Sequence, residues 1–226
     1  MITLHHAADT RSFRALWALE EIGLPYRLKM WPFPPRELAP AYLEENPLGT
    51  VPLLVDGHVR MTESAAICHY LATRDGPNPL AVDTVEADYG AYLNWLVYGE
   101  ATLTFPQAIV MRYGRLEPRE RRIPQAVEDY ARWFGARLRM LTAAVGDREW
   151  LCADRFTMAD VSVGYALLFA DIIGLSARFN PDLRAYWERL TARPAYVRAR
   201  AAQERAGIEQ GVPATDMRAL WRDPDA

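Results

Sequence analysis

Residues 46–64 read NPLGTVPLLVDGHVRMTES, and this stretch decides the fold. Two short apolar runs, residues 53–55 and residues 59–61, flank the dipeptide Asp56-Gly57. Because Asp-Gly favours the tight turns that join antiparallel strands, the pattern predicts a β-hairpin. Residues 64–72 then have the apolar spacing of a helix. The stretch therefore predicts two antiparallel strands followed by a helix.

Upstream of the hairpin, the chain alternates between strand and helix patterns. Residues 2–4 read as a buried strand, residues 13–23 as a helix that stops at a glycine, and residues 26–30 as a second strand. Four prolines fall within residues 31–40, so this segment is expected to be a loop. A short irregular helix is predicted at residues 41–45.

A linker, Gly76-Pro77-Asn78-Pro79, divides two kinds of pattern. Before it, the order βαβ-ββα is that of an α/β thioredoxin-like N-terminal domain, over residues 1–80. After it, almost every segment has helical spacing, which predicts an all-α C-terminal helical bundle domain over residues 84–226. The helical segments are residues 86–98, 123–144, 157–173, 181–191 and 194–206.

The third segment of the bundle carries a clear helix-start signal. Thr157 and Asp160 have the spacing of a capping box, and Phe156 and Val161 that of a hydrophobic staple. The cap residue alone is typically worth about 1 kcal/mol. Because the helix that follows is apolar nearly all round, we expect it to be the buried core helix of the second domain.

Composition and charge exclude several classes of partner. The 226 residues are half hydrophobic and carry a net charge of −3 with both signs interspersed, so we expect no nucleic-acid partner. No apolar run approaches the roughly 18 residues of a membrane span, and the N-terminus lacks signal-peptide features, which predicts a cytoplasmic protein with no membrane contact. Cys68 and Cys152 lie far apart in apolar contexts and are expected to be buried, reduced thiols.

Three landmarks together resemble the cytosolic glutathione S-transferase superfamily, in its bacterial serine- or threonine-type or unclassified members. They are residues 46–52, the pair Glu63-Ser64 at the start of a helix, and the capping box at Thr157. Their order and spacing match along the whole chain, and residues 11–21, RSFRALWALEE, also look like the first helix of bacterial members. The resemblance implies glutathione as co-substrate, no metal, and a homodimer.

The resemblance implies a glutathione-binding set of Thr50, Val51, Pro52, Glu63 and Ser64. Val51-Pro52 is similar to the family's cis-proline turn, in which the main chain before the proline pairs with the cysteinyl part of the tripeptide. Ser64 and Glu63 are expected to receive the carboxylate and the ammonium of the γ-glutamyl end. Thr50 stands where many relatives carry Gln or Lys, so a direct charged contact with the glycine carboxylate is not expected from it.

The turn after the first strand is where family members carry the Tyr, Ser or Cys that stabilises the glutathione thiolate. Here residues 5–12 read HHAADTRS, without Tyr or Cys. The candidate catalytic residues are Thr10 and Ser12, with a helix-capping role as the alternative for Ser12. An ionised Asp9 would oppose a thiolate. The two adjacent histidines would point to opposite faces of a strand and do not predict a metal site.

The resemblance also implies a second-substrate pocket between the domains. The candidates to line it are Tyr98, Phe105, Arg112 and Tyr113, with core packing and a solvated arginine as the alternatives. The tail, residues 207–226, either folds over this cleft or is frayed. The implied activity is attack of the glutathione thiolate on a small, hydrophobic electrophile, as in detoxification. Peroxide reduction, dehalogenation, ether cleavage, isomerisation or a non-catalytic binding and regulatory role are the alternatives.

Overall fold

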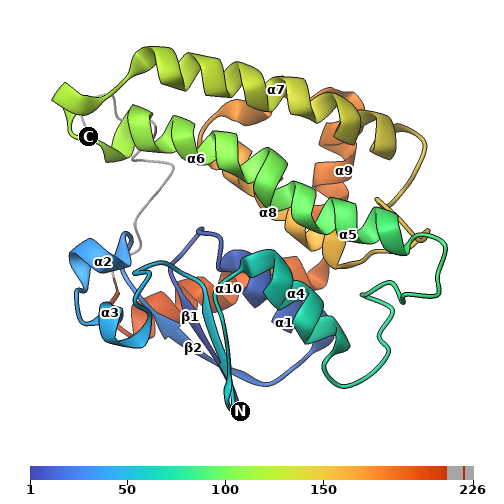
Figure 1. Ribbon diagram of the computed structural model, residues 1–226, viewed down its shortest axis with the longest axis horizontal. Helices are drawn as coiled ribbons and strands as arrows, with labels where there is room; N and C mark the ends of the chain where they lie inside the picture. Colours follow the sequence, from blue (N-terminus) through green and yellow to red (C-terminus); the bar gives the residue numbers. More distant parts are fainter. Residues whose placement is uncertain (213–220, 222–226) are drawn as a thin grey trace. The chain divides into compact units, whose positions relative to one another are not determined.

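The computed structural model describes residues 1–212 and Trp221, which form two compact units. The first unit comprises Met1–Ala81 together with the segment that begins at Thr191, and the second comprises Val82–Leu190 and Trp221 (Figure 1). The sequence predicts a single boundary near residue 80. In the structure, the last helix makes most of its contacts with the N-terminal residues and therefore belongs to the first unit.

The N-terminal unit is built on a four-stranded mixed sheet in the order β2-β1-β3-β4. β1 (Ile2–His6) pairs in parallel with β2 (Tyr26–Met30) and antiparallel with β3 (Leu53–Asp56). β3 forms the predicted hairpin with β4 (Val59–Met61). The predicted βαβ-ββα order of a thioredoxin-like domain is therefore confirmed.

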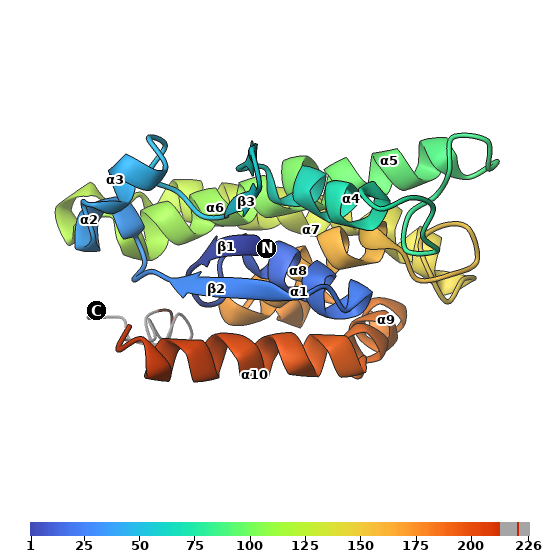
Figure 2. The same cartoon turned by 90° about the horizontal axis from the view of Figure 1, so that it is seen from below.

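Three helices pack on this sheet or on one another. α1 (Phe13–Ile22) contacts both α4 (Ser64–Thr73) and α10 (Pro194–Glu209), and α10 also contacts β2. Figure 2 shows α10 running alongside β2 and α1. α1 ends at Gly23, whose φ of 77° is the left-handed conformation that glycine adopts most easily. The fully buried side chains of α1 include Phe13, Leu16, Trp17 and Leu19.

The side chain just beyond α10 covers the open edge of the sheet. β2 is an edge strand, so part of its backbone has no neighbouring strand to pair with. The Gln210 amide donates to the Leu28 carbonyl at 2.9 Å and accepts from the Met30 N–H at 2.8 Å. One side chain thus makes two of the hydrogen bonds that a neighbouring strand would make, and it adds to the packing of α10 on α1 and β2.

The proline-rich segment after β2 contains more helix than predicted. It holds two short helices, α2 (Pro35–Leu38) and α3 (Tyr42–Glu45). The second matches the short helix expected at residues 41–45. The prediction of loop throughout residues 31–40 is wrong, because Pro35 occupies the first helical position, where the missing N–H of proline costs nothing.

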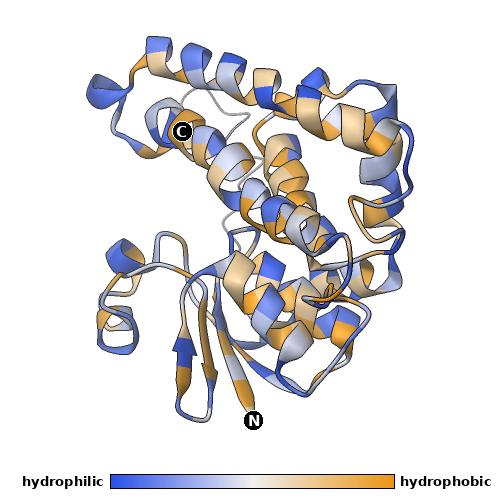
Figure 3. Cartoon of the chain, turned by 45° about the vertical axis from the view of Figure 1, so that its right-hand side comes forward, coloured by the Kyte–Doolittle hydropathy of each residue, from blue (hydrophilic) through white to orange (hydrophobic). Residues whose placement is uncertain are grey.

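The second unit is helical, as the sequence predicts. Its main helices are α5 (Tyr89–Val97), α6 (Phe105–Met111), α7 (Pro124–Gly146), α8 (Met158–Ile172) and α9 (Pro181–Thr191). α8 is buried along almost its whole length, as expected for the core helix. α7 is amphipathic, with hydrophilic and hydrophobic turns both visible in Figure 3. Its buried residues, spaced three or four apart, are Ala131, Phe134, Leu138, Leu141 and Val145.

The sequence patterns did not predict the helical segment between α5 and α7. Two wide, π-helical turns, η1 (Tyr98–Thr104) and η2 (Arg112–Leu116), flank α6 and break the regular helical spacing on which the prediction relied. η1 also lies very close to α8. A Cβ on Gly99 would come within 2.6 Å of the Ser162 backbone, so only glycine fits there.

The predicted capping box at the start of α8 is present. The Thr157 hydroxyl accepts from the Ala159 N–H at 3.3 Å, and the Asp160 carboxylate accepts from the Thr157 N–H at 2.8 Å. We expect Thr157→Ala to lower the free energy of unfolding by about 1 kcal/mol, because the first turn of α8 loses a hydrogen-bond acceptor. Denaturant unfolding checks this, with Thr157→Ser as the control that retains the hydroxyl. Equal losses in both variants would contradict the capping role.

Both cysteines are free and buried, as the sequence predicts. Burial raises the pKa of the Cys68 thiol to about 12 and that of the Cys152 thiol to about 11. Neither thiol is therefore ionised near neutral pH.

Within the part of the chain that the structure describes, no helix is long and apolar enough to cross a membrane.

Candidate functional site

The strand registers bring three segments to one end of the N-terminal sheet. β1 and β3 are antiparallel with His5 opposite Leu53, so the chain leaving β1 and the chain entering β3 lie at the same end. β3 and β4 are antiparallel with Leu54 opposite Met61, so the chain leaving β4 lies there as well. This end therefore holds the turn after β1, the loop before β3 and the start of α4, which are the segments that carry the predicted site residues.

Asn46 organises the loop before β3. Its carbonyl oxygen accepts from the Leu48 N–H at 3.2 Å, and its amide donates to the Thr50 carbonyl at 2.7 Å. The Tyr42 hydroxyl donates to the same carbonyl at 2.9 Å. The main chain of Thr50 is thus fixed from two sides, whereas its side chain is exposed.

The Val51–Pro52 peptide bond is cis, in agreement with the predicted turn. Val51 is 7% exposed and belongs to a small apolar cluster with Tyr42 and with Ala7 of the turn after β1. This packing joins the cis-proline loop to the turn that carries the candidate catalytic residues. The aromatic side chains packed against the cluster are Trp31 and Phe33.

The start of α4 combines a buried cation with an exposed carboxylate. The fully buried Arg14 donates from Nη1 to the Ser64 hydroxyl at 3.1 Å, so Ser64 keeps its own proton for another acceptor. Glu63 is exposed, and its carboxylate has no hydrogen bond or ion pair among the described residues. A ligand carboxylate at Ser64 would meet the Arg14 charge and the helix N-terminus, and a ligand ammonium would meet Glu63.

The two candidate catalytic hydroxyls lie side by side in the turn after β1. Ser12 Oγ is 2.6 Å from His6 Nδ1 and 2.8 Å from Thr10 Oγ1, and Thr10 Oγ1 is also 2.8 Å from the Ala7 carbonyl oxygen. Ser12 is fully buried, whereas Thr10 is 7% exposed. Ser12 makes no capping hydrogen bond to α1, so the alternative capping role is wrong: its hydroxyl is held by His6 instead.

Asp9, in the same turn, is paired with α10. It has a positive φ of 59°, and its carboxylate forms an ion pair with Arg200. The Gln203 amide donates to that carboxylate at 2.7 Å, while Gln203 Oε1 accepts from the Asp9 N–H at 3.2 Å and lies 3.0 Å from His6 Nε2. Sequence reasoning missed both α10 residues, because they follow Asp9 by more than 190 positions and no local pattern marks them.

These contacts determine which ring nitrogen of His6 carries the hydrogen. Gln203 Oε1 accepts from the Asp9 N–H, and Gln203 Nε2 donates to the Asp9 carboxylate. Only one orientation of the Gln203 amide satisfies both hydrogen bonds. His6 Nε2 must then carry the hydrogen that Gln203 Oε1 accepts, and His6 Nδ1 accepts from the Ser12 hydroxyl. Desolvation by burial lowers the pKa of His6 to about 4, so the ring is neutral at pH 7.

A neutral buried histidine makes stability depend on pH. The pKa of His6 falls from an ordinary 6.5 to about 4 on folding, so its stabilising contribution is complete above pH 6.5 and is lost as the pH falls toward 4. Between pH 7 and pH 5 we expect His6 to account for a loss of about 2 kcal/mol in the free energy of unfolding. Urea unfolding of wild type and His6→Gln at several pH values checks this. Identical pH slopes would contradict it.

His5 lies on the opposite face of β1 from His6. Its ring stacks on Trp31, with centroids 6.0 Å apart, and Trp31 Nε1 donates to His5 Nδ1 at 3.1 Å. Burial lowers the pKa of His5 to about 4. Among the described residues, no group of three or more His, Cys, Asp or Glu side chains could hold a metal ion.

The residues predicted to line a second-substrate pocket all belong to the helical unit. Tyr98 is 9% exposed and its hydroxyl donates to a backbone carbonyl of α7 at 2.7 Å, while Phe105 is 46% exposed. Arg112 donates to the Glu117 carboxylate at 2.8 Å, and its guanidinium lies 5.7 Å from the centre of the Tyr113 ring. Phe105 is thus the most accessible of the apolar candidates, and the pocket itself stays a prediction.

The prediction for the tail, residues 207–226, falls largely outside the described residues. α10 extends to Glu209, three residues beyond the predicted helix. The Trp221 carbonyl accepts from the Arg115 guanidinium at 3.0 Å and 3.2 Å, and that guanidinium lies 4.7 Å from the centre of the Trp221 ring.

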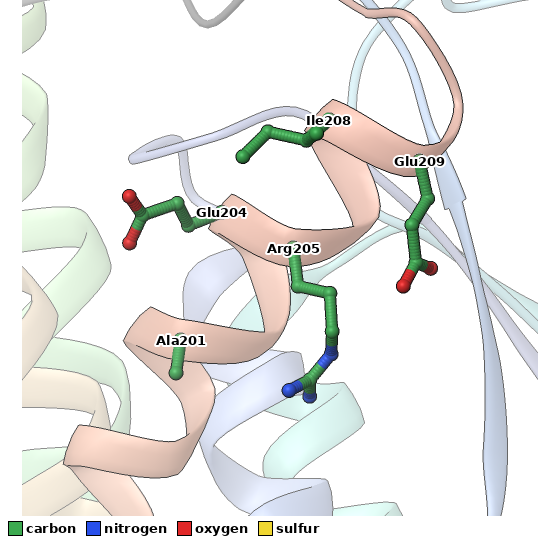
Figure 4. A pocket seen from close by; sticks show the side chains of 5 residues that line it. All are labelled: Ala201, Glu204, Arg205, Ile208 and Glu209. Carbon is green, nitrogen blue, oxygen red and sulfur yellow. The ribbon is translucent and has the colours of Figure 1, made fainter.

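A hollow on the exposed face of α10 involves none of the predicted site residues (Figure 4). The side chains that line it are Ala201, Glu204, Arg205, Ile208 and Glu209. It holds charges of both signs and is widely open to solvent, so we assign it no part in the candidate site.

Two family models match the chain. The one described as "Glutathione S-transferase, N-terminal domain" matches residues 10–74, and the one described as "Glutathione S-transferase, C-terminal domain" matches residues 108–194. Glutathione S-transferase 4 of Zea mays is 30% identical over 189 residues, which cover 80% of this chain and 83% of that protein. The chain belongs to the glutathione S-transferase family.

Other similar proteins add to this assignment. Glutathione S-transferase 3 of Schizosaccharomyces pombe is 38% identical over 103 residues, and the match spans 46% of this chain but only 43% of that protein. A solved structure of a glutathione transferase family member from Pseudomonas fluorescens, with two glutathione bound, is 25% identical. It covers 88% of this chain and 91% of its own, with a TM-score of 0.74.

Proposed function

We propose that the protein is a glutathione transferase that binds glutathione at the end of the N-terminal sheet. The observation that carries this proposal is the pair at the start of α4. Ser64 has a proton to donate over the buried Arg14, and the Glu63 carboxylate has no hydrogen bond or ion pair among the residues that the structure describes. These groups complement the carboxylate and the ammonium of a γ-glutamyl group, and the main chain of Val51 would pair with the cysteinyl part.

Thr10 is the hydroxyl that would stabilise the glutathione thiolate. Ser12 is fully buried and its proton is held by His6, whereas Thr10 is partly accessible and has a single proton shared between two nearby acceptors. Turning that proton toward a thiolate exchanges a neutral hydrogen bond for a charge-assisted one, which is about twice as strong. These contacts support the proposal that Thr10 contacts the thiol and that Ser12 holds Thr10 in place.

The required stabilisation is within reach of one hydroxyl and its surroundings. Lowering a thiol pKa from about 8.5 to about 6.5 requires about 2.7 kcal/mol. A hydrogen bond to a charged group contributes about 1.5–3 kcal/mol, and the N-terminus of α1 adds roughly 0.3–1 kcal/mol. The proposed second substrate is a small, hydrophobic electrophile, with Phe105 the first pocket residue to test.

A non-catalytic glutathione-binding or regulatory protein is the second candidate. The observation in its favour is that the Thr10 hydroxyl has acceptors within the chain, at Ala7 and Ser12, and needs no ligand to satisfy it. Retention on immobilised glutathione, followed by a panel of electrophiles, hydroperoxides, halides and aryl ethers, separates the candidates. Retention with turnover supports the enzyme and names its reaction, and retention without turnover supports the binding protein. Absence of both contradicts the proposal.

Two further features of the proposal rest on the family alone. We expect a homodimer, to be checked by analytical ultracentrifugation, and a cytoplasmic location, to be checked by fractionation of cells that express the protein.

A further inference from the structure

We infer that His6 is the internal acceptor of the glutathione thiol proton, which reaches it through Thr10 and Ser12. This inference rests on the proposed function and adds to it the destination of the proton. Catalysis by the family requires only that the thiol becomes a thiolate, and the proton could equally leave to solvent. The hydrogen-bond chain behind Thr10 points to a destination inside the protein.

The chain is short and continuous. Thr10 Oγ1 lies 2.8 Å from Ser12 Oγ, and Ser12 Oγ lies 2.6 Å from His6 Nδ1. Both contacts are buried, so water does not compete for these groups. Thr10 is the only one of the three side chains with any exposed surface, and His6 and Ser12 have none.

The direction of the hydrogen bonds suits proton uptake. His6 Nε2–H donates to Gln203, so His6 Nδ1 has a lone pair and Ser12 must donate to it. Ser12 Oγ is then an acceptor toward Thr10, and Thr10 Oγ1 can be an acceptor toward a thiol S–H. The Thr10 proton has two acceptors, the Ala7 carbonyl and Ser12 Oγ, and when it is directed to Ser12 every donor in the chain points toward His6, as a base requires.

The proton balance of the step is complete within these groups. The S–H bond of glutathione breaks and its proton passes to Thr10 Oγ1, the Thr10 proton passes to Ser12 Oγ, and the Ser12 proton passes to His6 Nδ1. The products are a thiolate and an imidazolium, with both hydroxyls neutral as before. The net charge of the site is unchanged, and Thr10 now donates to the sulfur.

The groups behind His6 support its charged form when the thiolate is present. Gln203 Oε1 accepts from His6 Nε2, the Gln203 amide donates to the Asp9 carboxylate, and the negative charge of Asp9 favours an imidazolium, whereas the positive charge of Arg200 opposes it. Burial makes His6 a weak base toward solvent, with a pKa of about 4. The imidazolium is therefore expected only as the partner of a bound thiolate, and not in the ligand-free protein.

The test counts thiolates and released protons in the same complex. Thiolate is measured by its ultraviolet absorbance, and protons by a pH indicator in weakly buffered solution, as wild-type protein is saturated with glutathione. S-methylglutathione provides the reference, because it binds through the same groups and has no thiol proton. The difference in proton release between the two ligands belongs to the thiol.

We expect thiolate to form in the wild type with fewer protons released than thiolates formed. His6→Gln should form less thiolate and release one proton for each, whereas His5→Gln, which changes the buried histidine on the other face of β1, should behave as wild type. One released proton per thiolate in the wild type would overturn the inference and leave the proposed function standing. Binding without any thiolate would overturn both.

A second measurement does not depend on the variants. The ¹⁵N shifts of the His6 ring should move from one protonated nitrogen to two when glutathione is added, and should not move with S-methylglutathione. A His6 ring that stays neutral in a complex with full thiolate would overturn the inference even if His6→Gln fails to fold.

Discussion

Thr10→Val is expected to lower kcat/KM for glutathione-dependent turnover by about 25-fold at pH 7, with a limit of about 100-fold at lower pH. Valine has nearly the shape of threonine but no hydroxyl, so the change removes the proton that faces the thiolate. The limit corresponds to about 2.7 kcal/mol, or a thiol pKa about 2 units higher in the complex. The thiolate is then the minor form at neutral pH, and the acid limb of the rate profile moves to higher pH by the same amount.

The measurement is kcat/KM from pH 5 to pH 10, together with the thiolate absorbance of the bound ligand over the same range. Thr10→Ser keeps the hydroxyl and should retain most of the activity. Above the shifted pKa, Thr10→Val should approach the wild-type rate, because the thiol is then ionised without assistance. A Thr10→Val enzyme with the wild-type pH profile would show that this hydroxyl does not act on the thiol.

Glu63→Ala is expected to raise the KM for glutathione by between about 10-fold and 100-fold, with little change in kcat. The Glu63 carboxylate has no hydrogen bond or ion pair among the described residues, so its removal breaks none there and the effect reports on the ligand. The carboxylate would pair with the γ-glutamyl ammonium, far from the sulfur, and so contributes equally to the ground state and the transition state.

Initial rates at varied glutathione concentration measure this effect. Glu37→Ala is a matched control, since Glu37 is another exposed carboxylate in the same unit, at the end of an ion pair with Arg36. An equal change of KM in both variants would mean that only the surface charge matters, and it would remove Glu63 from the site.

Local patterns were sufficient to predict the strands of the sheet and α4. The hairpin and the helix that starts at Ser64 each depend on residues within a few positions of one another, whereas the cis-proline turn was expected from the family resemblance. The hairpin places the start of α4 beside the loop before β3, but the pairing of β1 with β3, which adds the turn after β1, joins residues about 50 positions apart and follows from no local signal.

The support behind the turn could not be predicted in this way. In the sequence, Gln203 and Arg200 show only the spacing of an amphipathic helix. This spacing predicts that one face of the helix is buried, but it does not identify the element on which that face packs. The contact between α10 and the turn after β1 decides that Ser12 binds His6 instead of capping α1. The π-helical turns around α6 were missed for a different reason, because they change the period on which helix prediction depends.

Isothermal titration of glutathione into wild type and Glu63→Ala tests the central claim, that the end of the N-terminal sheet is a glutathione site. Cysteinylglycine, which lacks the γ-glutamyl group, should be titrated into both proteins in parallel. We predict that wild type binds glutathione more tightly than cysteinylglycine, and that Glu63→Ala reduces this preference by the contribution of the ammonium contact while its affinity for cysteinylglycine is unchanged. Equal glutathione affinity in the two proteins, or no binding to either, would contradict the account.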